Sequence, residues 1–163
     1  MNEPGNTFEL ELKVRDYEVD LQGIVNNAVY LHYLEHARHE FLISRDIDFS
    51  AMHGQGNDLI VTRIEIDYKH PLKSRDKFKV TLQVKKAGSL KVIFEQAIVR
   101  LPDIKLIVEA RVTGICLKNG RPVRPEDILD TRRLGLPPGP AAAHERAGEN
   151  LAPREEKCSK RKS

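Results

Sequence analysis

The sequence predicts an α+β domain in which a curved five-stranded antiparallel sheet wraps around one long helix. Five runs of residues alternate apolar and polar side chains, as strands with one buried face do. One run has the three-to-four-residue spacing of an amphipathic helix, and it follows the first strand. Because short turns join the later strands, these strands should pair antiparallel, with the helix covering the concave face of the sheet.

The first strand and the helix are expected at the start of the chain. Between Thr7 and Arg15 every second residue is apolar, which indicates a half-buried strand. From Asn27 to Ser44 the spacing predicts an amphipathic helix of about five turns. Its apolar stripe consists of Tyr30, Tyr33, Leu34, Ala37, Phe41 and Leu42.

Four further strands are expected after a polar connection that contains Gly54 and Gly56. Turn residues at 71–76, 87–89 and 102–103 separate these strands from one another. A sheet of this kind has unpaired edge strands, so pairing with a second copy of the chain is expected. The predicted apolar rows are Ile60, Ile64, Ile66 and Tyr68; Phe78, Val80, Leu82 and Val84; Leu90, Val92, Phe94 and Ile98; and Ile104, Leu106, Val108, Ala110 and Val112.

Residues 1–130 are predicted to form one domain, and residues 131–163 a disordered basic tail. The length of 163 residues, with 40% apolar and 31% charged residues, fits one ordinary globular domain. Residues 131–163 contain four prolines, no aromatic residue, and eight Lys or Arg against four Asp or Glu. Such a segment buries too little apolar area to offset its ordering entropy, so a chain cut after Asp130 is expected to fold as before.

The composition argues against a membrane protein, a disulfide-rich protein and a nucleic-acid-binding protein. No run approaches the ~18 consecutive apolar residues of a membrane span, and the N-terminus lacks a basic and apolar leader pattern, so a cytoplasmic protein is expected. Cys116 and Cys158 have neither disulfide nor zinc-site spacing, which indicates free thiols. Residues 1–130 carry nineteen basic against twenty acidic residues, which disfavours a nucleic-acid partner.

The segment between the first strand and the helix is the best candidate for a site. Asp20 lies just before Gly23 and before the helix N-terminus, where backbone N–H groups lack helical acceptors. A carboxylate beside such groups can activate water, or can attack a carbonyl carbon whose oxygen the N–H groups polarise. The alternative is that Asp20 only stabilises the turn or caps the helix.

Four short motifs within residues 7–128 are similar in sequence and spacing to those of a known family. They are Asp20-x-x-Gly23-x-Val25, Tyr30, Glu35-x-Ala37-Arg38 and Tyr68-x-x-Pro71-Leu72. Together they resemble the 4-hydroxybenzoyl-CoA thioesterase branch of the hotdog superfamily. The resemblance implies a hotdog domain, a homodimer or tetramer, and hydrolysis of acyl thioesters of coenzyme A or of an acyl carrier protein. It implies neither a cofactor nor a metal.

Carried over residue by residue, the resemblance implies that Asp20 is the catalytic aspartate. The backbone N–H of Asn27, seven positions later, would polarise the thioester oxygen. Many family members have an aromatic residue or a histidine just before the helix, whereas this chain has two consecutive asparagines. In that respect it is similar to the subgroup that acts on fatty-acyl or 3-oxoacyl carrier proteins. The substrate-binding residues expected from the same motifs are Gly23, Val25, Asn26 and Tyr30.

Glu35 is the reserve candidate for the catalytic carboxylate, because some relatives in the wider superfamily use a helix glutamate. Its alternative role is an ordinary ion pair along the helix surface. His32, His36 and Glu40 recur at four-residue intervals, but the sequence offers no further ligands near them. No metal site is therefore expected.

Two sets of polar residues in the predicted sheet are further candidates for substrate binding. Thr62 interrupts an apolar row, so it either bonds to the backbone or faces the acyl pocket. Lys86, Ser89 and Lys91 lie around a turn, where they are suited to bind the phosphates of coenzyme A or an acidic carrier-protein helix. Ordinary surface charge is the alternative for each of these three.

Two other functions remain open from the sequence. One is a non-catalytic acyl-thioester-binding hotdog module, in which Asp20 only caps the helix. The other is a hotdog hydratase, which needs an acid and a base beside the α and β carbons of the acyl chain. The Asp20 loop supplies one such group, and the sequence offers no convincing second one.

Overall fold

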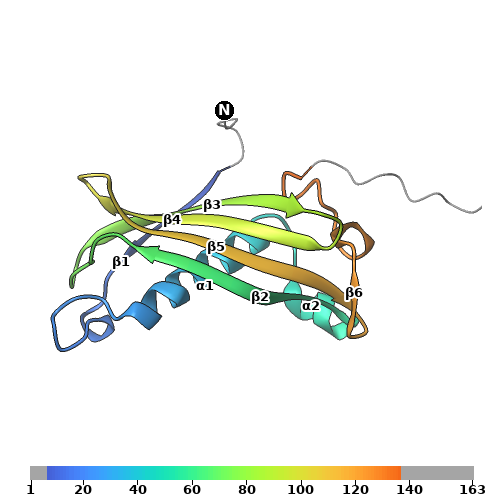
Figure 1. The fold of residues 1–163 in the computed structure, drawn as a ribbon, viewed down its shortest axis with the longest axis horizontal. Helices are drawn as coiled ribbons and strands as arrows, with labels where there is room; N and C mark the ends of the chain where they lie inside the picture. Colours follow the sequence, from blue (N-terminus) through green and yellow to red (C-terminus); the bar gives the residue numbers. More distant parts are fainter. Residues whose placement is uncertain (1–6, 137–163) are drawn as a thin grey trace, which may run out of the picture.

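The structure is a computed structural model that describes residues 7–136. The predicted α+β architecture is confirmed: a curved antiparallel sheet lies over one long helix, α1 (Figure 1). The helices are α1 (Asn27–Ile43) and the short α2 (Phe49–Gly54), and the 3-10 turns are Asp16–Glu18 and Pro125–Asp127. The strands are β1 (Phe8–Lys13), β2 (Asn57–Tyr68), β3 (Lys77–Ala87), β4 (Lys91–Leu101), β5 (Lys105–Lys118) and β6 (Arg121–Val123).

The strand order in the sheet is β1-β3-β4-β5-β2, and every neighbouring pair is antiparallel. The five long strands are those expected from the alternation, while β6 is a short addition that pairs with the end of β5. The polar connection after α1 contains α2, which the sequence pattern did not indicate. Asp48 caps this helix by accepting a hydrogen bond from Ala51 N at 3.1 Å.

The apolar stripe of α1 packs against the concave face of the sheet over β3, β4 and β5. Residues near the N-terminal half of the helix pack with one part of the sheet, and those near its C-terminal half pack with another. The first cluster includes Tyr30, Tyr33, Leu34, Ala37, Phe78, Val80 and Ile98. The second includes Phe41, Leu42, Leu82, Val84, Phe94, Val112 and Leu134. Because buried side chains from β3, β4 and β5 share these clusters, the helix cannot leave the sheet without exposing most of the core.

The predicted apolar row of β2 differs from the structure because of a bulge at Thr62. Ile60 pairs with Ile115 on β5, and Ile64 pairs with Val112. These two partners are three residues apart, and residues an odd number apart point to opposite faces of a strand. Ile60 and Ile64 therefore lie on opposite faces of the sheet. The Thr62 hydroxyl donates to the Thr113 carbonyl at 3.2 Å, which satisfies the side chain on the backbone.

The boundary predicted at Asp130 is wrong for the next six residues. Residues 131–136 pack against the domain: Thr131, Leu134 and Leu136 are only 4%, 1% and 6% exposed. Leu134 joins the cluster around Phe41, so this segment completes the core at one end of α1. Composition misled here because two leucines suffice to anchor a short, otherwise polar segment. Residues 137–163 of the predicted tail lie outside the described residues.

Two other expectations concern the cysteines and membrane spans. Cys116 is a free thiol in the core, and burial raises its pKa to about 11. Cys158 lies outside the described residues. Within residues 7–136, no helix is long and apolar enough to cross a membrane.

The packing of residues 131–136 generates a first prediction about stability. Leu134→Ala should lower the free energy of unfolding by about 2–5 kcal/mol, because it leaves a cavity beside Phe41. Chemical denaturation measures this change. Leu21→Ala is the matched control: that side chain is fully exposed, so its removal should change stability by less than about 0.5 kcal/mol. A chain ending at Asp130 should be destabilised at least as much as Leu134→Ala, and equal stability of the shortened and full chains would contradict this packing.

Candidate active site

The loop between β1 and α1 folds back on itself and presents Asp20. Val19 and Val25 form an isolated antiparallel bridge, and Asp20 N donates to Ile24 O at 2.8 Å. Gly23 N donates to Asp20 O at 3.0 Å, and Gly23 has the left-handed φ of 74°, which glycine adopts without strain. The Asp20 side chain is half-buried, and its Oδ1 accepts from Gln22 N at 2.8 Å. The turn therefore fixes the carboxylate through one oxygen.

The N-terminus of α1 supplies an N–H group without an acceptor. Asn26 is the N-cap, and its Oδ1 accepts from Ala28 N at 2.9 Å. The Asn27 N–H finds no acceptor among residues 7–136, while the Asn27 carbonyl accepts from the Tyr68 hydroxyl at 3.1 Å. This N–H lies at the positive end of a helix of 17 residues, which favours a developing negative charge there.

Asp20 and Asn27 line the same surface hollow of about 390 Å³. The loop, the start of α1 and the segment after β2 enclose it, so three separate parts of the sequence form one site. Its lining residues are Asp20, Gln22, Ile24, Val25, Asn27, Tyr30, Tyr68, Lys69, His70 and Pro71. A carboxylate and an unpaired N–H from two residues that line one hollow can together activate water and polarise a carbonyl oxygen.

Several predicted site residues are thus brought together by the fold. Val25 and Tyr30 line the hollow with the two proposed catalytic groups, and Gly23 and Asn26 shape its rim through the turn and the cap. Tyr68 and His70 were not among the predicted site residues, although both line the hollow. The signal for them was the Tyr68-x-x-Pro71 motif at the end of a strand, where the chain turns back over the helix.

Glu18 connects the Asp20 loop to α1 through a buried hydrogen bond. Although it is charged, this side chain is only 7% exposed. Its Oε2 accepts from the Tyr33 hydroxyl at 2.6 Å and from Arg15 N at 2.7 Å, while Arg15 Nη1 approaches Oε1 at 3.2 Å. Burial and the neighbouring carboxylate raise the pKa of Tyr33, so its hydroxyl remains a donor.

Tyr30 holds the other wall of the hollow. Its hydroxyl oxygen accepts from Leu72 N at 2.9 Å, and Leu72 O in turn accepts from Val25 N at 2.9 Å. The Tyr30 ring also packs edge-on against Tyr68, with centroids 5.5 Å apart. Burial raises the pKa of Tyr30. Tyr30 therefore supports the wall of the hollow from the core and ties it to the Asp20 loop.

Glu35 does not meet Asp20 within one chain. It is exposed and lies eight residues along α1 from Asn27, which corresponds to about 12 Å of helix. It lines a separate groove between α1 and β2. The Thr62 hydroxyl is likewise occupied by the backbone at the β2 bulge.

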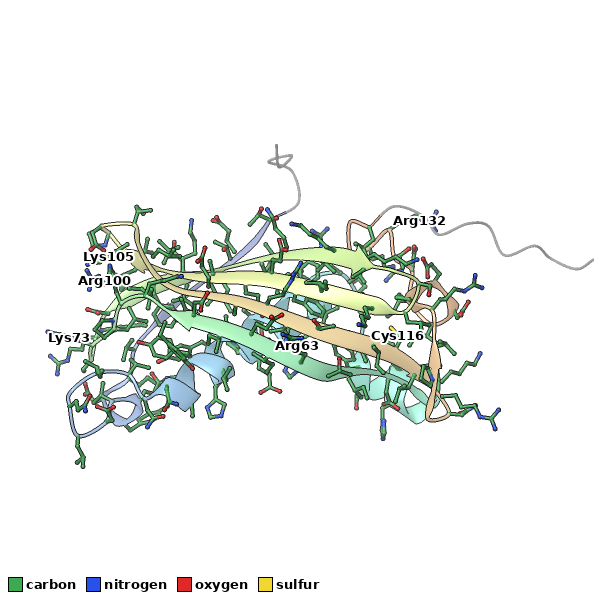
Figure 2. The ribbon with its side chains drawn as sticks, viewed as in Figure 1. Arg63, Lys73, Arg100, Lys105, Cys116 and Arg132 are labelled. Carbon is green, nitrogen blue, oxygen red and sulfur yellow. The ribbon has the colours of Figure 1, made fainter. Side chains whose placement is uncertain are left out.

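Lys86, Ser89 and Lys91 lie at the opposite end of the sheet from Asp20. β3 starts near the hollow and reaches Lys86 nine residues later, which spans about 30 Å. Figure 2 labels one residue near each end of the sheet. Lys73 lies two residues after Pro71, which lines the hollow, and Cys116 lies next to Ile115, the residue that pairs with Lys91. Lys86 also forms an ion pair with Glu126. The single chain therefore does not bring this group to the hollow.

No group of three His, Cys, Asp or Glu side chains in the described part of the chain is arranged to hold a metal ion. His32 and His36 instead line a wide groove beside β1 with Tyr33.

The chain is similar in sequence to known thioesterases. A family model described as the thioesterase-like superfamily matches residues 14–138. A chloroplastic acyl-acyl carrier protein thioesterase of Arabidopsis thaliana is 40% identical over 121 residues, covering 74% of this chain and 64% of that protein. A long-chain acyl-CoA thioesterase of Escherichia coli is 31% identical over 110 residues, covering 68% of this chain and 83% of that protein. The chain spans slightly less than two thirds of the length of the Arabidopsis relative.

Solved structures share the fold. The crystal structure of a probable thioesterase from Escherichia coli has a TM-score of 0.67 and 30% identity, covering 77% of this chain and 95% of that chain. A 1,4-dihydroxy-2-naphthoyl-CoA thioesterase from Synechocystis has a TM-score of 0.71 at 20% identity, covering 77% of this chain and 93% of that chain. At that identity the second likeness shows the fold alone.

The buried contact between Glu18 and Tyr33 generates a second prediction. Tyr33→Phe should lower the free energy of unfolding by about 1–3 kcal/mol, because it removes a donor from a buried carboxylate. Thermal and chemical denaturation measure the change. Tyr17→Phe removes the same hydroxyl from a side chain that is 79% exposed, so it should be nearly neutral. Equal effects of the two substitutions would show that the contact does not hold the loop.

Proposed function

The chain belongs to the thioesterase-like superfamily and has the hotdog fold, and on this premise we propose that it hydrolyses acyl thioesters of coenzyme A or of an acyl carrier protein. The products are a free acid and a thiol. The observation that carries this proposal is that Asp20 and Asn27, whose backbone N–H has no acceptor among the described residues, line one hollow. The names of the Arabidopsis and Escherichia coli relatives support the two carriers.

The proposed chemistry places the thioester carbonyl between these two groups. Asp20 takes a proton from water as the water oxygen attacks the carbonyl carbon, and the Asn27 N–H stabilises the negative oxygen of the tetrahedral intermediate. Collapse of the intermediate breaks the carbon–sulfur bond, and the proton passes from Asp20 to the leaving thiolate. In the alternative route Asp20 attacks the carbonyl itself, and water then hydrolyses the resulting mixed anhydride.

A homo-oligomer is part of the proposal because β2 is an unpaired edge. On this strand Ile60, Val61, Ile64 and Tyr68 are 41%, 48%, 41% and 47% exposed, although several of them face the helix side of the sheet. A long apolar edge favours pairing with another strand. A second copy that pairs along β2 would also cover the seam between α1 and β2, next to the hollow.

A third prediction tests the role of Asp20. Asp20→Asn should reduce kcat by about 10²-fold or more with little change in KM, because the amide keeps the size and the turn acceptor but cannot take a proton. Steady-state hydrolysis of several acyl-CoA and acyl-carrier-protein thioesters measures this. Glu35→Gln is the matched control and should have a much smaller effect on kcat, since Glu35 does not line the hollow that contains Asp20 and Asn27. A larger loss in Glu35→Gln would move the catalytic carboxylate onto the helix.

The same substrates separate the alternatives that the sequence left open. Binding of acyl thioesters without any release of thiol would identify a non-catalytic module, and addition of water to an enoyl thioester would identify a hydratase. Mass spectrometry after many turnovers in ¹⁸O-water distinguishes the two thioesterase routes. Label enters the Asp20 carboxylate if it attacks the carbonyl, and stays out if it activates water.

A fourth prediction concerns assembly. In sedimentation experiments at micromolar concentration the protein should be a dimer or a tetramer, because the exposed edge of β2 leaves apolar side chains uncovered in one copy. Specific activity should fall on dilution if the copies complete each other's site. A fully active monomer at that concentration would rule out the shared site.

A further inference from the structure

Arg38 is a buried cation on the face of α1 that packs against the sheet. It is only 8% exposed, and its Nη1 donates to Gln96 Oε1 at 2.9 Å. Gln96 is itself fixed, because its Nε2 donates to Leu34 O at 2.9 Å. This second contact sets the orientation of the Gln96 amide, so that its oxygen faces the guanidinium. The position of Arg38 is therefore built into the core between α1 and β4.

No carboxylate within residues 7–136 forms an ion pair with Arg38. Glu35 lies one turn away on the same helix and favours the charged form, but the two side chains are not in ion-pair contact. Burial lowers the pKa of Arg38, yet a guanidinium stays protonated in proteins. A buried charge with one neutral partner is unfavourable unless something else supplies acceptors.

Arg38 lines a groove between α1 and β2, and among the described residues only its Nη1 has a hydrogen-bond acceptor. In the described part of the chain, two side-chain atoms are inaccessible to solvent and have no hydrogen-bond partner: Asn57 Oδ1 and Glu126 Oε2. The nitrogens of Arg38 are not among these atoms, so each of them either has an acceptor or is accessible to solvent. The groove has a volume of about 510 Å³. Besides Arg38, its lining combines four polar side chains, Glu35, His39, His53 and Asp58, with a larger apolar set. The apolar members are Leu42, Phe49, Leu59, Ile60, Val61 and Phe94.

This groove and the Asp20 hollow lie along one seam between α1 and β2. Tyr68 and Asn27 join the two elements at the hollow, where the Tyr68 hydroxyl bonds to Asn27 O. Arg38 is eleven residues further along the helix, a distance of about 16 Å. Between the two sites the helix-facing side of β2 carries Ile64, which is 41% exposed. An acyl chain whose thioester sits in the hollow can therefore extend over apolar surface toward Arg38.

We propose that Arg38 binds a carboxylate at the far end of the acyl group, so that the protein prefers acyl groups with an acid terminus to alkyl groups of equal length. This inference rests on the proposed thioesterase function. The guanidinium fork matches the two oxygens of a carboxylate, and the burial of Arg38 strengthens a charged contact made there. An alkyl terminus would instead cover the cation and leave its N–H groups without acceptors.

The test compares coenzyme A thioesters that differ only at the terminus, carboxylate against methyl, over a series of chain lengths. The intact protein should favour the acid-terminated substrate by about tenfold or more in kcat/KM at the length that reaches Arg38. Arg38→Met should remove or reverse this preference, mainly through KM, and Arg38→Lys should retain part of it. Arg63→Met is the matched control, because Arg63 pairs with Glu65 and its β2 position faces away from α1.

Two results would overturn the proposal. One is an intact protein that prefers the methyl terminus, or neither terminus, at every length. The other is an unchanged preference for the acid terminus in Arg38→Met. If this variant keeps the preference but forms a weaker dimer, Arg38 contacts a second copy of the chain and not the substrate. If Arg38→Met does not fold, the intact protein still decides through calorimetric binding of free diacids against monoacids. That measurement also separates this inference from the proposed function, which fails on its own if no thioester is hydrolysed.

Discussion

The position of α1 in the concave face of the sheet depends on four buried side-chain hydrogen bonds. All of the fully buried side-chain hydrogen bonds in the described residues involve this helix. Apolar contacts drive its burial, but they are not directional and would tolerate sliding along the sheet. Hydrogen bonds in a core have strict geometry, because a misplaced partner leaves a buried polar group unsatisfied. The four pairs are Tyr30 with Leu72, Tyr33 with Glu18, Arg38 with Gln96, and Gln96 with Leu34.

Two of these bonds explain why the hollow has a defined shape. Tyr33 holds the loop through Glu18, and Tyr30 holds the segment after β2 through Leu72. The loop and that segment also bond directly to each other, because Val25 N donates to Leu72 O at 2.9 Å. Asp20 and the Asn27 N–H are therefore placed by a supporting layer of tyrosines. A site on a loop gains precision when its supports are locked in this way.

The other two bonds join α1 to β4, and Arg38 lines the neighbouring groove between α1 and β2. Along the seam between α1 and β2 the helix-facing side of β2 remains exposed, and Arg38 sits at the edge of that seam without a counter-ion. A single copy therefore has exposed apolar side chains on β2 and a buried cation on the same side as its candidate catalytic groups. The proposed second copy would cover the exposed side chains of β2, and the proposed acyl group would supply an acceptor for Arg38.

The sequence by itself determined the elements whose pattern is local. The periods of two and 3.6 predicted the five long strands and α1, and the spacing of Asp20, Gly23 and Asn27 predicted the turn and the helix start. The tertiary structure alone decided that the bulge puts Ile60 and Ile64 on opposite faces, and that Glu18 is buried. It also decided that Lys86 pairs with Glu126 and that Leu134 joins the core. These features depend on partners far away in the chain, and the burial of a side chain or the pairing of a charge is set by those partners. Local periodicity cannot predict these features. One inserted residue reverses the face on which a strand residue lies, and one distant hydrogen-bond partner allows a charged side chain to be buried.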